Sequence, residues 1–68
     1  MDQETFNLSI RRLLKTVGVS SQREIKQAVA NAIAAGTITG SETLAATMTL
    51  QIAALRLEVS FDGEIKLQ

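Results

Sequence analysis

The sequence predicts an α+β fold, in which two N-terminal helices joined as a helix–turn–helix pack on a small C-terminal antiparallel β meander or hairpin. Apolar residues recur at helical spacing in the first half of the 68-residue chain. From Met48 onward they alternate with polar residues, as in strands. A third observation, Gly18 followed by Ser21 and Glu24, predicts where one helix ends and the next begins.

The first helix is expected over residues about 3–17. Its apolar stripe follows the spacing i, i+4, i+7, i+8 and i+11, and consists of Phe6, Ile10, Leu13, Leu14 and Val17. Leu8 points away from this stripe into a basic face. We expect an interaction surface there, made of Leu8, Arg11, Arg12 and Lys15.

The second helix is expected over residues about 21–35. Gly18 can adopt the left-handed conformation that ends a helix. Ser21 and Glu24 have the spacing of a capping box, which starts the next helix, and Gly36 is placed to end it. The outer face of this helix carries Arg23, Gln27, Ala30, Asn31 and Ala34.

Three strands are expected at residues about 47–52, 55–60 and 64–68. A turn at Ala53-Ala54 would join the first two strands, although alanines are poor turn formers. A three-residue loop at residues 61–63, with Gly63 left-handed, would place Glu58 opposite Lys66 in the last two. The alternative is a continuous helix over residues 44–59, which leaves Leu50 and Leu57 out of phase.

The expected core combines the two helical stripes with one face of the strands. Its residues are Phe6, Ile10, Leu13, Leu14, Val17, Ile25, Val29, Ile33, Leu50, Leu57, Val59 and Ile65.

Composition argues against catalysis. The chain contains no His, Cys or Tyr, so the common general bases, nucleophiles and transition-metal ligands are missing. We therefore expect no enzyme activity, no catalytic residue, no cofactor and no metal. Glu58, Asp62 and Glu64 could attract a hard cation at the predicted turn, but solvated turn charges explain them equally well.

Charge and hydropathy predict a small soluble cytoplasmic protein of one domain, residues 1–68. Seven basic residues balance seven acidic ones. Residues 1–36 carry a net charge of +2 and residues 37–68 a net charge of −2. The N-terminus is acidic, unlike a secretion signal, and no apolar run approaches the roughly 20 residues of a membrane span.

Two segments carry a family resemblance. Residues 6–19 with 21–25, and the closing Asp62-Gly63-Glu64-Ile65-Lys66-Leu67, resemble a family of short bacterial proteins described only as a domain of unknown function. The resemblance covers nearly the whole chain and brings no catalytic or binding residues with it. It implies a small stand-alone protein of the bacterial cytoplasm.

These observations predict a non-catalytic protein-interaction module whose partner is another protein or a second copy of the chain. The last strand, residues 64–68, offers an open sheet edge for a homodimer. The alternative is a winged-helix-like nucleic-acid-binding protein, with contacts from Gln22, Arg23, Lys26 and Gln27. Against that alternative, the supposed wing tip is acidic and Glu24 occupies a position where the motif expects a buried aliphatic residue.

Overall fold

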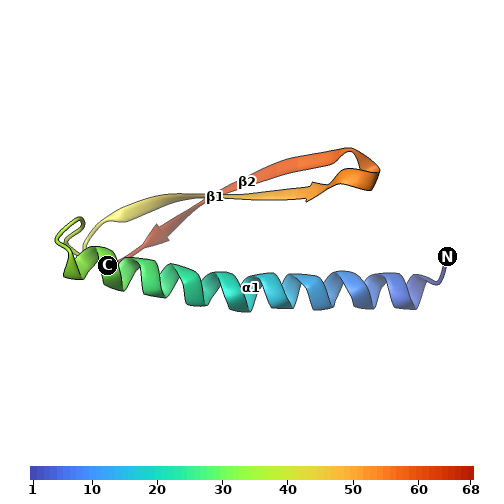
Figure 1. The fold of residues 1–68 in the computed structure, drawn as a ribbon, viewed down its shortest axis with the longest axis horizontal. Coiled ribbons are helices and arrows are strands. Elements are labelled where there is room, and N and C mark those ends of the chain that lie inside the picture. Colours follow the sequence, from blue (N-terminus) through green and yellow to red (C-terminus); the bar gives the residue numbers. More distant parts are fainter. The chain divides into compact units, whose positions relative to one another are not determined.

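The computed structural model describes residues 1–68 and contains one long helix followed by one β hairpin (Figure 1). Helix α1 spans Gln3–Ala34, strand β1 spans Thr43–Ile52, the single 3-10 turn η1 spans Ala53–Leu55, and strand β2 spans Leu57–Lys66. The chain divides into two compact units, Met1–Thr37 and Ile38–Gln68. The predicted α+β class is confirmed.

Helix α1 is continuous, so the predicted helices over 3–17 and 21–35 with a turn between them are wrong. Gly18 lies in the middle of the helix and does not have a positive φ. Ser21 and Glu24 are interior helical residues and form no capping box. A break at Gly18 would expose several backbone hydrogen bonds to water, whereas a glycine inside a helix costs only about 1 kcal/mol. The continuous helix therefore has a lower free energy than the interrupted one.

The two ends of α1 are capped by local hydrogen bonds. Asp2 is the N-cap, and its carboxylate accepts from the amides of Glu4 at 3.0 Å and Thr5 at 3.3 Å. At the C-terminal end Gly36 has a φ of 77°, donates to the Ile33 carbonyl, and is followed by a bond from the Thr37 amide to the Ala32 carbonyl. This pair of bonds is a Schellman motif, so the predicted helix end at Gly36 is confirmed.

The C-terminal unit is a two-stranded antiparallel hairpin rather than a three-stranded meander. Ten pairs run from Thr43 opposite Lys66 to Ile52 opposite Leu57. Residues 57–60 and 64–66 of the two predicted strands belong to one strand, β2, and the predicted loop at residues 61–63 is wrong. Asp62 and Gly63 pair with Thr47 and Ala46. One long ladder contains backbone pairs that two shorter ladders would lack. The free energy of these pairs outweighs the local turn preference of Asp62-Gly63.

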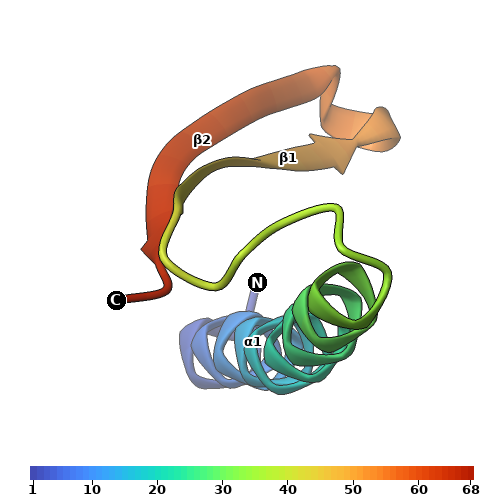
Figure 2. The ribbon, with the colours of Figure 1, turned by 90° about the vertical axis from the view of Figure 1, so that its left-hand side faces the viewer.

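The hairpin turns at Ala53-Ala54, the weaker of the two turns that the sequence predicts. Residues 53–56 connect the strands, and Arg56 adopts the left-handed conformation with a φ of 51°. The predicted strand 47–52 lies within β1, but a two-residue turn would have paired Ile52 with Leu55, and the observed partner is Leu57. The alternative helix over 44–59 is excluded by this ladder. The two strands twist about each other (Figures 1 and 2), as two-stranded ribbons do.

No residue of either unit is buried, so the predicted core is not observed. Of its twelve members only Val29, Leu50 and Ile65 are half-buried, and the others are exposed. Leu14, for example, is 60% exposed. The physical reason lies in the architecture of each unit: a single helix, or a single layer of two strands, has no second layer of its own to cover an apolar face.

Candidate interaction surfaces

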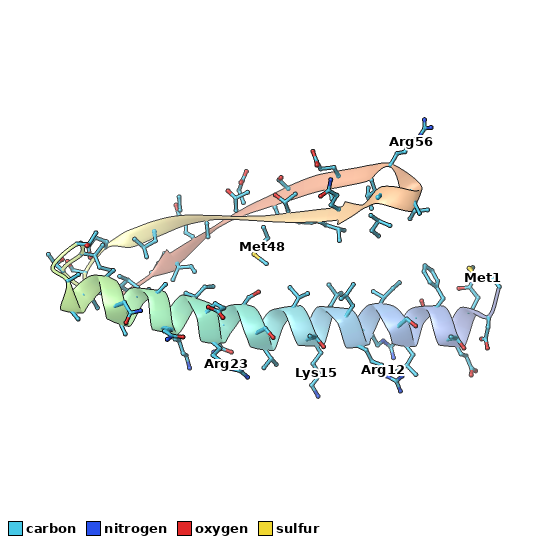
Figure 3. The ribbon with its side chains drawn as sticks, in the orientation of Figure 1. Met1, Arg12, Lys15, Arg23, Met48 and Arg56 are labelled. Atoms are coloured by element: carbon cyan, nitrogen blue, oxygen red, sulfur yellow. The ribbon has the colours of Figure 1, made fainter.

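Four cations line one side of α1. At about 100° per residue, Arg12, Lys15, Arg23 and Lys26 fall within about 80° around the helix axis. Figure 3 shows Arg12, Lys15 and Arg23 projecting from the same side of the helix. The four residues, named here the basic stripe, extend along about 21 Å of helix at about 1.5 Å per residue. The continuity of α1 is what aligns them.

The residues predicted as two separate sites lie largely on this one face. Leu8, which is 43% exposed, and Val19, which is 51% exposed, fall at the angular centre of the basic stripe. Val19, Gln22, Arg23 and Lys26 line a shallow, open depression of about 250 Å³. Arg11 and Gln27 lie outside the basic stripe, each about 40° beyond its edge on opposite sides by the helical spacing. The 11-residue spacing from Arg12 to Arg23, and from Lys15 to Lys26, is the sequence signal for this alignment.

The apolar stripe of α1 lies roughly on the opposite side of the helix from the basic stripe. The five residues predicted for this stripe, from Phe6 to Val17, fall within about 100° around the helix axis. All five are exposed to solvent. Ile25, Ala28 and Ala32 continue the stripe beyond Ser21 and Glu24. The result is a helix with one apolar and one cationic side, the pattern of a helix that packs through one side and is solvated on the other.

The hairpin separates polar from apolar residues completely except for one alanine. Alternation along β1 and β2, with the observed register, places ten residues on each face. The apolar face consists of Leu44, Ala46, Met48, Leu50, Ile52, Leu57, Val59, Phe61, Gly63 and Ile65. Met48 projects from it in Figure 3, and Phe61 is 58% exposed. This apolar face is the most continuous exposed apolar surface of the C-terminal unit.

The opposite face of the hairpin is polar and acidic. The Thr47 hydroxyl donates to the Asp62 carboxylate at 3.0 Å, and the Thr49 and Ser60 hydroxyls are hydrogen-bonded at 3.1 Å. Glu58, Asp62 and Glu64 alternate along β2 rather than clustering at a turn. No group of three or more acidic side chains is close enough to hold a metal ion.

The segment that leads into β1 is organised by Glu42, a role the sequence reasoning missed. Its carboxylate accepts hydrogen bonds from the amides of Thr39 at 2.8 Å, Gly40 at 2.9 Å and Ser41 at 3.1 Å. The bonds from Thr39, the largest cause, and from Gly40 favour the ionised form and lower the pKa of Glu42 to about 2. The local signal is a glutamate that directly follows a Thr-Gly-Ser turn sequence.

The two units carry opposite charge. Met1–Thr37 has five basic and three acidic side chains, a net charge of +2, and Ile38–Gln68 has two basic and four acidic ones, a net charge of −2. The boundary between the units thus coincides with the change of sign that the sequence displays. Copies of such a chain carry no net charge and do not repel one another.

Comparison with protein families assigns the whole chain. The model of the Family of unknown function (DUF6494) matches residues 1–68. The chain belongs to this family. The predicted resemblance is therefore confirmed, and DUF6494 membership brings no assigned activity. No match to a curated protein or to a solved structure was found. α1 of this DUF6494 protein is not long and apolar enough to cross a membrane.

Proposed function

We propose that this DUF6494 protein is a non-catalytic protein-interaction module that binds its partner through the apolar face of the hairpin. One observation carries the proposal: ten consecutive pairs place every apolar strand residue except Ala45 on one face, and none of these residues is buried. Covering apolar surface contributes about 25 cal/mol per Å². A face of this kind therefore favours association over exposure to water.

The chemistry of the side chains supports a binding role over a catalytic one. A chain without His, Cys or Tyr has few groups that titrate or attack near neutral pH. The shifted carboxyl groups, Asp2 and Glu42, have their pKa lowered by hydrogen bonds that cap a helix and close a turn. Neither group has its pKa shifted toward neutral pH, where a general acid or base works best.

Site-specific photo-crosslinking tests the proposal. A photoreactive amino acid replaces Phe61 on the apolar face or, as matched control, Ser60 on the polar face of the same strand. After irradiation in cells that express the protein, adducts are identified by mass spectrometry. We expect protein adducts from position 61 and few from position 60. Equal yields from both positions, or no adduct from position 61, would reject the apolar face as a binding surface.

Nucleic-acid binding is the second candidate, and the basic stripe of α1 is the observation that favours it. A winged-helix docking mode needs two helices and a turn, which the continuous α1 does not provide. What the stripe offers instead is phosphate contact by four cations on one helix face. Titration with mixed duplex DNA at low salt tests this: salt-sensitive chemical-shift changes at Arg12, Lys15, Arg23 and Lys26 would support it.

A further inference from the structure

Both strands of the hairpin have one unpaired side. The sheet contains only β1 and β2, so each strand directs half of its backbone N–H and C=O groups away from its neighbour. α1 pairs its own backbone groups internally, and backbone bonds outside the ladder involve only the helix ends, η1 and Leu67 with Glu42. An isolated two-stranded hairpin is marginally stable in water. The chain contains no third strand, so any further strand in this sheet would have to come from another chain.

The two open edges differ in chemistry. Natural edge strands are protected against pairing by charged residues, proline or bulges. β1, with the sequence TLAATMTLQI, has ten residues without a charge, a glycine or a proline. β2 carries Glu58, Asp62 and Glu64 on its polar face. The residues of β1 thus provide no charge or proline to protect its edge, whereas β2 carries three carboxylates.

We propose that the β1 edge pairs with the β1 edge of a second copy, forming a four-stranded antiparallel sheet in the order β2–β1–β1–β2. This inference goes beyond the proposed function, because it uses the open strand edge and leaves the apolar face of the hairpin free for a partner. It also moves the dimer contact from the edge at residues 64–68, which the sequence favoured, to the other side of the hairpin. Two copies of β2 would bring six carboxylates together, whereas the polar face of β1 is Thr, Ala and Gln.

The register of the β1–β1 pairing is restricted because the apolar faces of the two hairpins must lie on the same side of the sheet. Directly opposed residues lie on the same side of a sheet, so residue numbers that face each other across the twofold axis must add to an even number. The geometric centre of β1, between Thr47 and Met48, gives an odd sum and would join an apolar face to a polar one. The two permitted registers nearest the centre of β1 place the twofold axis between two opposed Thr47 residues or two opposed Met48 residues, and in both the sheet has one continuous apolar face.

Charge does not oppose a second copy. The opposite charges of the two units leave each copy neutral, so no long-range repulsion opposes association.

A lysine pair on the β1 edge tests the proposal. In Thr47→Lys/Gln51→Lys the new lysines lie opposite Asp62 and Glu58 of the same hairpin, so the hairpin gains cross-strand charge pairs while its open edge becomes charged. The matched control, Ser60→Lys/Glu64→Gln, makes the same change of +2 on β2. By sedimentation equilibrium at tens of micromolar we expect a wild-type dimer, a control dimer, and a dissociation constant raised by more than about tenfold in the β1 variant.

Three results would overturn the inference: a monomeric wild type, a β1 variant that dimerises as well as the control, or a control that dissociates instead. Amide dispersion in NMR spectra verifies that the β1 variant retains the hairpin. A monomeric wild type that still gave Phe61-position adducts with another protein would refute the homodimer and leave the proposed function standing.

Cysteine crosslinking provides a second measurement that does not depend on a destabilising change. The chain has no native cysteine, so Thr47→Cys, Met48→Cys and, as control, Asp62→Cys each present one thiol. Asp62 lies opposite Thr47 but on β2. With a short bismaleimide, covalent dimers are expected at position 47 or 48 and not at 62. Dimers at 62 alone, or at none of the three positions, would overturn the β1 seam.

Discussion

Replacing Gly18 with alanine tests the continuity of α1. Gly18 has a helical backbone without a positive φ, and a Cβ built at this position meets no atom within 4 Å. Alanine is favoured over glycine inside an exposed helix by about 0.5–1 kcal/mol. For a domain of 60–100 residues, 1 kcal/mol corresponds to about 4–8 °C in Tm. We therefore expect Gly18→Ala to raise Tm by about 2–8 °C, measured by far-UV circular dichroism.

The matched control is the same substitution at Gly36. A Cβ there also meets no atom within 4 Å, but the φ of 77° is left-handed. Alanine in that conformation costs about 1 kcal/mol or more, so Gly36→Ala is expected to lower Tm. The opposite signs of two chemically identical changes isolate the backbone conformation as the cause. A Gly18→Ala variant that melts below wild type would refute the continuous helix and restore a turn at residue 18.

Three further predictions concern local hydrogen bonds and the hairpin turn. The folded pKa of Glu42 is depressed to about 2, so the contribution of this carboxylate to stability is present above the ordinary pKa of 4.5 and is lost as pH falls toward 2. In urea unfolding, the Glu42→Gln variant should therefore lack the part of the pH dependence that wild type shows between these two values. Asp2→Ala removes the cap acceptors and should reduce helix signal and Tm, whereas Asp2→Asn, which keeps one acceptor, should lose less. Arg56→Gly relieves the left-handed φ of 51° and should stabilise the hairpin by about 0.5–1 kcal/mol in urea unfolding, with an unchanged midpoint or a lower one contradicting the turn geometry.

Two local predictions from the sequence, the helix break after Gly18 and the loop at residues 61–63, are wrong because hydrogen bonds extend along whole elements. Gly18 with Ser21 and Glu24 is a plausible helix boundary, and Asp62-Gly63 is a strong hairpin turn signal. Each signal is a local preference of about 1 kcal/mol. An unbroken 32-residue helix and a ten-pair ladder each satisfy more backbone groups than the interrupted alternatives. Alanines are poor turn formers, but the chain turns at Ala53-Ala54 because the ladder requires it to reverse direction there.

The sequence by itself determined the periodicities of this protein: a helical apolar stripe in the first half, strand alternation in the second, the helix end at Gly36 and the segregation of charge. These are properties of residue spacing and side-chain chemistry, which do not depend on partners far along the chain. Only the tertiary structure decided that the basic residues of two expected helices form one stripe, and that Asp62 pairs with Thr47 fifteen residues away. It also decided that nine of the twelve expected core residues are exposed and none is buried, because burial requires a second layer and neither unit contains one.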